Sequence, residues 1–139
     1  MQTWLTFTKK DNMRLISHLD MIRLFRKAFR RAKIDLLYTE GFNPQQRFAV
    51  TNPLPLGFES LDEKMAIETE SPFTEEKMNR LNEELPRGVA ILSFYEPAEK
   101  TDLHSKFPFS IFAIQGLSQE NINDILSEIV AMKQEDEVI

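Results

Sequence analysis

The most informative absence in this sequence is cysteine. Its 139 residues include no cysteine, and only 4 glycines, 1 tryptophan and 2 tyrosines. Without cysteine the chain forms no disulfide and lacks the thiolates that hold an iron–sulfur cluster, so such chemistry must belong to a partner protein or a neighbouring domain. No stretch approaches the roughly 20 apolar residues of a membrane helix, and the first residues carry no apolar run of signal-peptide length. We therefore expect a cytoplasmic protein that does not contact a membrane.

The sequence does have enough apolar material for one core, and its charge is unevenly distributed. Hydrophobic residues make up 42% of the chain, which fits one compact domain without cross-links. The net charge of −5 is the sum of two unlike halves. Residues 1–50 hold ten Lys and Arg against four Asp and Glu, whereas residues 51–139 hold seven against eighteen. This separation predicts that the first half attracts polyanions, and it also allows neighbouring molecules to associate head to tail.

Much of the positive charge lies in residues 17–33, SHLDMIRLFRKAFRRAK, which we predict to be a helix. Ser17 can cap its start, and Asp20 stands three residues later, as in a shortened capping box. Apolar residues recur at spacings of three and four, as expected for one buried face. The residues predicted to form this face are Leu19, Ile22, Phe25, Ala28, Phe29 and Ala32.

The opposite face of this helix is basic. Its six cations, with no acid among them, are Arg23, Arg26, Lys27, Arg30, Arg31 and Lys33. Like charges four residues apart repel each other by roughly a few tenths of a kcal/mol per pair. Two explanations are open at this point: an anionic partner such as a phosphate relieves the repulsion, or acids from other parts of the fold screen it.

A turn-rich segment, YTEGFNPQQRFAVTNPLPLG, follows at residues 38–57. Gly41 can take a left-handed turn conformation, and Asn43 followed by Pro44 favours a turn. The later prolines exclude this segment from the middle of a sheet. We predict a loop of fixed shape, of the kind that often carries binding groups, although prolines also simply keep an edge strand from pairing with other chains.

These stretches resemble a known family. The runs SHLD, LFRKAFRRA, YTEGFNP and PLPLGFES are similar to the radical-SAM-linked domain of unknown function, most strongly over residues 5–60 and in register to about residue 97. That domain is fused behind, or encoded beside, cobalamin-binding radical SAM proteins, so the resemblance implies a radical SAM protein as partner. The sequence departs from the family after GFNP, where Gln45, Gln46 and Arg47 replace a His-Pro-Lys type sequence. The departure keeps a positive charge and removes an imidazole.

The order of the predicted elements indicates a fold. Strands are expected at residues 3–8, at 36–38 with 46–51, at 63–70 and at 89–95, and a second helix capped by Thr74 is expected before Pro86. The order strand, helix, strand, strand, helix, strand is that of the ferredoxin-like split βαβ arrangement, in which right-handed crossovers place both helices on one face of an antiparallel sheet. We therefore predict an α+β fold with a ferredoxin-like unit at residues 1–97.

Residues 98–139 begin the pattern again. Residues 107–115 alternate as a strand does, and Ser118 can cap a third helix. The apolar stripe of that helix consists of Ile122, Ile125, Leu126, Ile129, Val130 and Met132. We expect a partial second βα unit. It packs either on the sheet edge of the first unit, which allows one compact domain, or against a partner.

The two histidines give little support for catalysis or metal binding. His18 stands in the first helical turn, where the positive helix end lowers its pKa and favours a neutral imidazole. It is a weak candidate for a general base, because a histidine at a helix start is more often a surface hydrogen-bonding group. His104 has no acidic or histidine neighbour at metal-ligand spacing, and no phosphate-binding loop or nucleophile–base motif occurs. We expect no metal and no cofactor, and we assign no activity to the chain on its own.

One small site is predicted from the helix start and the following loop. We expect two polar clusters to converge at one end of the sheet and to form a pocket suited to a phosphate or a nucleotide end. Its residues are Ser17, His18, Asp20, Glu40 and Asn43, with Arg47 beside them. Alternatively, Asp20 and Glu40 merely satisfy backbone donors near the turns.

Three functions of different classes are open. The first is a non-catalytic accessory module that binds RNA or another polyanion and works with a radical SAM protein; its binding residues would be Arg23, Arg26, Lys27, Arg30, Arg31 and Arg47. The second is a protein-interaction domain that docks the same partner without nucleic acid. The third is an endoribonuclease on a ferredoxin-like scaffold, with His18 as general base and cations that stabilise the developing phosphate charge. Only fold analogy and one histidine support the third, so it ranks last.

Overall fold

The computed structural model describes residues 1–51, 54, 56–100, 120, 121, 123, 124, 126 and 127. The chain divides into two compact units, Met1–Pro108 and Phe109–Ile139. In the second unit, the described residues between Glu120 and Ser127 are helical, as predicted, and the hydroxyl of Ser127 donates to the carbonyl oxygen of Asn123 at 3.0 Å. The predicted strand at 107–115 and the rest of the third helix lie outside the described residues.

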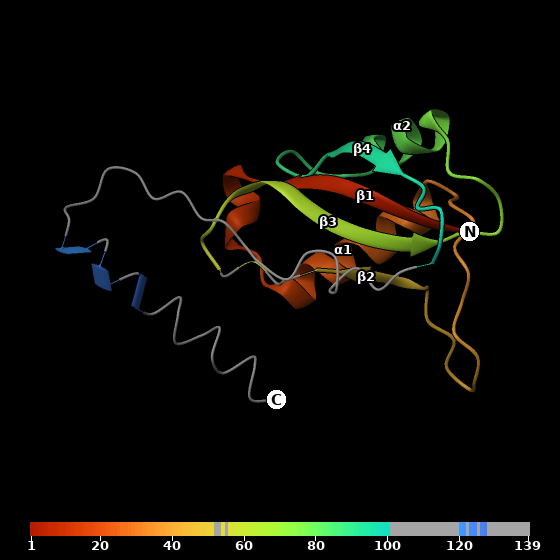
Figure 1. The fold of residues 1–139 in the computed structure, drawn as a ribbon, viewed down its shortest axis with the longest axis horizontal. Coiled ribbons are helices and arrows are strands. Elements are labelled where there is room, and N and C mark those ends of the chain that lie inside the picture. Colours follow the sequence, from red (N-terminus) through yellow and green to blue (C-terminus); the bar gives the residue numbers. More distant parts are fainter. Residues whose placement is uncertain (52–53, 55, 101–119, 122, 125, 128–139) are drawn as a thin grey trace. The chain divides into compact units, whose positions relative to one another are not determined.

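In the first unit, the described residues contain one antiparallel sheet with strand order β2-β3-β1-β4 (Figure 1). Each central strand pairs antiparallel with its neighbours, β1 with β3 and β4, and β3 also with β2. The elements in chain order are β1 (Gln2–Lys9), the short 3-10 helix η1 (Asp11–Leu15), α1 (His18–Arg31), β2 (Phe48–Val50), β3 (Ser60–Glu68), α2 (Glu75–Glu83) and β4 (Ile91–Tyr95). This order and this pairing agree with the ferredoxin-like split βαβ arrangement, and the predicted α+β fold is confirmed.

The core lies between the sheet and the helices. The ring of Phe25 in α1 lies 5.0 Å from that of Phe7 in β1, and the ring of Phe29 lies 5.3 Å from that of Phe48 in β2, measured between centroids. Phe25 and Phe29 are fully buried, as the helical spacing predicted. In the strand predicted at residues 63–70, Met65, Ile67 and Thr69 are all 0% exposed, and Ala66 between them is 9% exposed.

The buried face of α1 differs from the prediction in its first turn. Leu19, which we expected in the core, is 57% exposed, whereas Met21 is 3% exposed. A helix turns by about 100° per residue, so Met21 lies only about 40° around the axis from Phe25, while Leu19 lies about 120° away. The apolar stripe is therefore centred on Phe25 and Phe29, and Leu19 faces solvent.

The two ends of α1 are both closed by defined hydrogen bonds. The Ser17 hydroxyl accepts from the backbone N–H of Asp20 at 3.1 Å, which confirms the predicted cap. At the other end, the N–H of Lys33 donates to the carbonyl of Arg30 at 3.1 Å and the N–H of Ile34 to that of Phe29 at 3.0 Å. This is the Schellman ending of a helix. Among the described residues, no helix combines the length and the apolar character required to span a bilayer.

The second helix and the last strand are joined by a turn that requires glycine. Thr74 caps α2 as predicted, since its hydroxyl accepts from the N–H of Lys77 at 3.3 Å. Gly88 then adopts φ +99°, and a Cβ at this position would lie 2.3 Å from the carbonyl oxygen of Lys10. The N–H of Lys10 donates to the Gly88 carbonyl at 3.0 Å, so this turn is fixed against the end of β1.

Candidate functional site

The predicted cations of α1 stand mostly on its solvent side. Arg23, Lys27, Arg30 and Arg31 are exposed, as is Lys33 just after the helix, while Arg26 is half-buried. The residues at positions 23, 27 and 31 are four apart, so they form one column with about 6 Å of helix axis between successive members. We call the exposed members, Arg23, Lys27, Arg30, Arg31 and Lys33, the basic face.

The basic face has few acidic partners. The guanidinium of Arg23 lies 3.3 Å from the carboxylate of Asp20, in an exposed pair within the helix. Within the part of the chain that the structure describes, the other four members form no ion pair. Acids near the helix end bind other cations: Asp35 pairs with Lys77 at 2.8 Å. Direct pairing of the basic face with acids of the described residues is therefore limited to Asp20.

The end of α1 places a lysine where the backbone favours glycine. Lys33 has φ +54°, in the left-handed region. This position of a Schellman ending is usually glycine, and a residue with a Cβ costs roughly 1 kcal/mol more there. The fold accepts this cost, and the fifth cation of the basic face stands next to the helix end.

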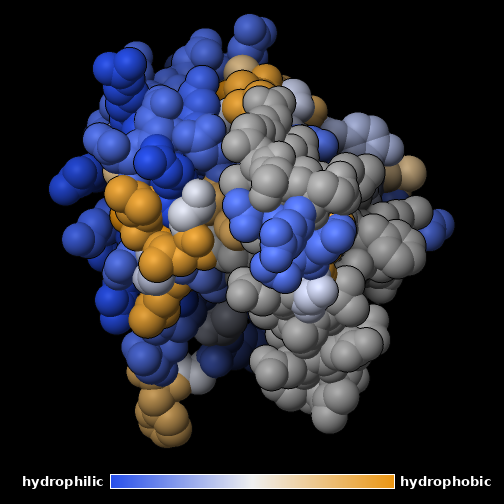
Figure 2. Space-filling view, turned by 90° about the vertical axis from the view of Figure 1, so that its left-hand side faces the viewer, coloured by the Kyte–Doolittle hydropathy of each residue, from blue (hydrophilic) through white to orange (hydrophobic). Residues whose placement is uncertain are grey.

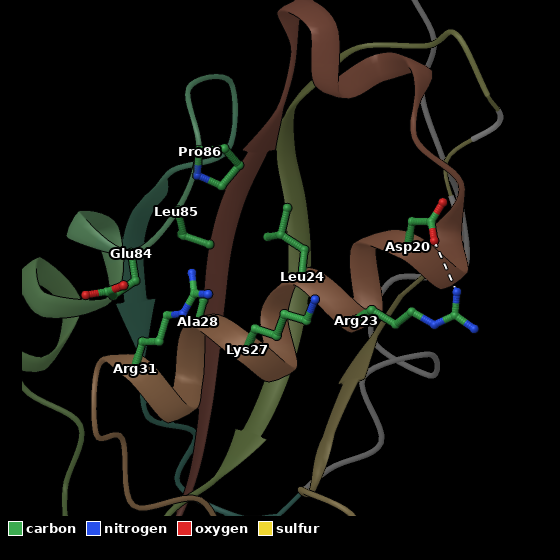
Figure 3. A pocket seen from close by; sticks show the side chains of 9 residues that line it. All are labelled: Asp20, Arg23, Leu24, Lys27, Ala28, Arg31, Glu84, Leu85 and Pro86. Atoms are coloured by element: carbon green, nitrogen blue, oxygen red, sulfur yellow. Dashed lines mark hydrogen bonds and ion pairs between the residues drawn. The ribbon is translucent and has the colours of Figure 1, made fainter.

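A groove runs beside the basic face, between α1 and the turn that joins α2 to β4 (Figure 3). Its volume is about 480 Å³. Leu24 and Ala28 contribute apolar surface from α1, and Leu85 and Pro86 contribute it from the turn. In Figure 3, the side chains of Lys27 and Arg31 extend from α1 toward this apolar surface, and the other residues at the edge of the groove are Asp20, Arg23 and Glu84.

The predicted pocket between the helix start and the turn-rich loop is not formed. Ser17, His18 and Asp20 stand where β1 ends, since the Lys9 ammonium at that end donates to the carbonyl just before Ser17 at 2.9 Å. Glu40 lies, with Asn43, in the loop before β2, at the end where β1 begins. The eight residues of β1 separate these ends by roughly 25 Å. The chain runs back along the sheet through α1 before it reaches the loop, so the two clusters cannot meet.

Arg47 does not join the basic face either. It directly precedes β2, and its guanidinium lies 3.2 Å from the carboxylate of Glu68 on β3. Glu68 also lies 2.6 Å from the ammonium of Lys100. The hydrogen bond from Lys100, with a smaller one from Arg47, lowers the pKa of Glu68 although burial opposes this. The charge of Arg47 is thus compensated locally, and one predicted binding residue is separated from the others.

His18 lies half-buried at the start of α1, close to the charge of Lys9. Burial, and then the Lys9 ammonium, lower the pKa of the imidazole below its usual value, as predicted in direction. Lys9 is itself buried, and burial lowers its pKa while the nearby Glu63 opposes the shift. A neutral imidazole can accept a proton or a hydrogen bond. Among the described residues, no group of three or more His, Cys, Asp or Glu is placed to hold a metal ion.

Sequence reasoning missed a polar cluster formed by Asp35, Ser71 and Lys77. The Lys77 ammonium donates to Asp35 at 2.8 Å, to the Ser71 hydroxyl at 2.6 Å and to the carbonyl of Pro72 at 2.9 Å. A serine beside a lysine also occurs in nucleophile–base pairs. Here the Lys77 ammonium uses all three of its donors, one of them on a carboxylate, so its contacts are those of a structural ion pair. The cluster instead ties the segment after α1 to the start of α2.

Comparison with known proteins gives a family but no activity. A family model described as an uncharacterized protein conserved in bacteria (DUF2344) matches residues 2–139. No curated protein and no solved structure matches the sequence. The family description names no ligand, partner or reaction, so any function has to be argued from the basic face and the groove.

Proposed function

We propose that this chain, which belongs to the DUF2344 family over residues 2–139, is a non-catalytic module that binds RNA through the basic face of α1. The observation that carries the proposal is the exposed column of Arg23, Lys27 and Arg31, of which only Arg23 has an ion pair among the described residues. Cations without acidic partners attract phosphates and gain free energy by releasing the counterions of the nucleic acid. The repulsion along the helix falls when an anion binds.

An exposed aromatic ring supports the same proposal. Phe42, in the loop before β2, is fully exposed rather than part of the core. This loop projects at the end of the sheet where α1 terminates, the end at which Arg30, Arg31 and Lys33 stand (Figure 1). Aromatic rings stack on unpaired bases and add affinity that tolerates many sequences.

As part of the same proposal, the module works in the cytoplasm beside a radical SAM protein. The support is the resemblance of SHLD, YTEGFNP and PLPLGFES to the radical-SAM-linked domain. Because the 139 residues contain no cysteine, the thiolates of an iron–sulfur cluster would come from the other polypeptide.

Charge reversal tests the proposal. Changing Arg23, Lys27 and Arg30 together to Glu should abolish binding to total cellular RNA, measured by fluorescence anisotropy. The affinity of the unchanged protein should fall steeply as salt is raised. A control with the same change in net charge replaces three exposed cations outside α1, namely Lys10, Arg87 and Lys100. Equal loss in both variants, or no RNA binding at low salt by the unchanged protein, would refute the proposal.

A second candidate function, docking of a protein partner, is favoured by a separate observation. Leu15, Leu19, Leu56 and Leu61 lie toward the end of the sheet where β1 ends, and each is more than half exposed. The N–H of Gly57 donates to the carbonyl of the residue before Leu15 at 2.7 Å, which brings Leu56 close to Leu15. Figure 2, which faces this end, shows hydrophobic residues gathered in a patch bordered by hydrophilic ones. Exposed apolar patches often mark protein interfaces.

The docking function and RNA binding predict different mutant phenotypes. Replacing Leu15 and Leu19 together by Ser should weaken binding of the radical SAM protein and leave RNA affinity unchanged. RNA cleavage by His18, the third function predicted from sequence, has no further observation in its favour. It requires product formation that disappears in His18→Ala while RNA binding persists.

A further inference from the structure

The groove beside α1 has a feature that RNA binding by charge alone does not use. A polyanion held only by its phosphates needs exposed cations and no apolar surface. The groove offers apolar surface from two separate elements, Leu24 and Ala28 of α1 and Leu85 and Pro86 of the turn before β4. This surface lies directly beside the cationic column of the basic face.

The charges around the groove lie mainly on one side. Lys27 and Arg31 extend toward the apolar surface, whereas Arg23 is turned to Asp20 at one end of the groove (Figure 3). The Glu84 carboxylate points away from the apolar residues of its own turn in the same view. A ligand that fits this site therefore has an apolar face on one side and an anionic group on the other.

A nucleotide has this distribution of chemistry. Its base is a flat ring system whose faces pack against apolar side chains, and its phosphates are covalently linked to the base through the sugar. The volume of about 480 Å³ accommodates a nucleobase together with its sugar. In a duplex the base faces are stacked on each other and cannot reach such a surface.

We propose that the groove holds the base of one unpaired nucleotide against Leu24, Leu85 and Pro86 while Lys27 and Arg31 bind the adjoining phosphates. The module then selects single-stranded RNA over duplex RNA. This inference rests on the proposed function and specifies the form of RNA that the basic face receives.

The test compares four probes on the whole chain by fluorescence anisotropy and competition. These are a labelled single-stranded 12-nucleotide RNA of mixed sequence, the duplex of that RNA, heparin as a polyanion without bases, and polyglutamate as an acidic polypeptide. We expect the single strand to bind at least tenfold more tightly than the duplex at the same salt concentration.

Two substitutions in the groove separate base contact from charge. Leu24→Ser should weaken single-stranded RNA at least fivefold and leave heparin binding unchanged, whereas Leu24→Trp should strengthen single-stranded RNA because it adds a stacking surface. The matched control is Leu19→Ser, the same change at an exposed position of α1 outside the groove, which should leave the affinities for RNA and heparin unchanged. Circular dichroism of each variant shows whether it is folded, and Leu24→Trp provides the test if Leu24→Ser is not.

The outcomes distinguish this inference from the function on which it rests. Equal affinity for single strand and duplex, or unchanged RNA affinity in both Leu24 variants, overturns the groove and leaves RNA binding by charge intact. Binding of polyglutamate as tight as that of RNA overturns the choice of a nucleotide and identifies an acidic polypeptide as the occupant. Failure of both RNA forms to bind at low salt overturns the proposed function itself.

Discussion

Replacing Asp35 by Asn should destabilise the protein measurably, and the loss should depend on pH. The Asp35 carboxylate accepts a hydrogen bond from the ammonium of Lys77 at 2.8 Å and another from the backbone N–H of Ser71 at 2.8 Å. The side chain of Lys77 is 15% exposed and that of Asp35 is 31% exposed, so solvent screens the pair only partly. After the change, Lys77 loses its only anionic partner in the described residues.

The structure sets the expected magnitude. A hydrogen bond to a charged group contributes about 1.5–3 kcal/mol. The Asn carbonyl can still accept the two bonds from the backbone N–H and the hydroxyl of Ser71, so the main loss is the bond from Lys77. Allowing for the exposed part of Asp35, we expect the free energy of unfolding to fall by about 1–2 kcal/mol at pH 7. The matched control is Asp20→Asn, because Asp20 and Arg23 form a pair whose side chains are 57% and 62% exposed. That change should cost less than about 0.5 kcal/mol.

The pH dependence of the loss follows from the pKa of Asp35. Burial alone would raise this pKa, but the hydrogen bonds from Lys77 and Ser71 outweigh burial and hold it far below its usual range. A carboxylate with a lowered folded pKa stabilises the protein fully above its unfolded pKa of about 3.9 and loses this contribution as pH falls toward the folded value. The difference between the unchanged protein and Asp35→Asn should therefore be constant from pH 7 to about pH 5 and shrink below about pH 4.

Urea denaturation followed by circular dichroism at a series of pH values measures this difference. Two results would refute the reasoning. One is a loss in Asp35→Asn no larger than in Asp20→Asn at pH 7. The other is a difference that stays constant down to pH 3, because the lowered pKa would then not be present in the folded protein.

Three further predictions follow from other parts of the structure. Phe29→Ala should lower the free energy of unfolding by about 3–5 kcal/mol in urea denaturation, because the ring is fully buried. The control Phe42→Ala, at an exposed ring, should lower it by less than about 1 kcal/mol. An equally small loss in Phe29→Ala would contradict the packing of α1. Lys33→Gly should stabilise the protein by about 0.5–1 kcal/mol in the same assay, because position 33 has a left-handed backbone that glycine adopts more easily. The same change removes a cation of the basic face and should weaken RNA binding. A destabilised variant would contradict the left-handed conformation at position 33. In an NMR titration, His18 should show a pKa below 6.5 that rises in Lys9→Met, because burial and the Lys9 charge both lower it; an unchanged pKa would show that Lys9 has no such effect.

The fold was predictable because its signals are local. Ser17 and Thr74 cap the two helices at the predicted residues, and the alternation through Met65 and Ile67 places one face of β3 in the core. Each signal depends on residues within one or two turns or on a strand period of two, and such patterns can be recognised from sequence. The order of the elements then restricts the topology to very few choices. The error at Leu19 is of the same local kind, because spacings of three and four do not fix the centre of a helical stripe in its first turn.

The site was less predictable because it depends on contacts between distant segments. Asp35 and Ser71 are 36 residues apart, and no local pattern links them. The groove likewise combines Leu24 of α1 with Leu85 and Pro86 of a later turn. The predicted pocket fails for a different reason: it conflicts with the predicted fold. In a split βαβ arrangement the crossover helix returns along the sheet, so its first residue and the loop after it must lie at opposite ends.

The like charges along α1 repel each other, although Arg30 and Arg31 in its last turn also interact favourably with the negative end of the helix dipole. The like-charge neighbours at positions 23 and 27, 27 and 31, and 26 and 30 together destabilise the helix by about 1 kcal/mol. Lys33 in its left-handed conformation adds roughly as much. The sequence alone left open whether acids elsewhere in the fold screen this charge, and in the described residues only Asp20 pairs with the basic face. Glu on α1 and Gly at position 33 would remove the cost without disturbing the core. An anion bound from outside these residues, as the RNA-binding proposal requires, would relieve the repulsion between these cations. The charge-reversal variants therefore also test whether this repulsion has a functional reason.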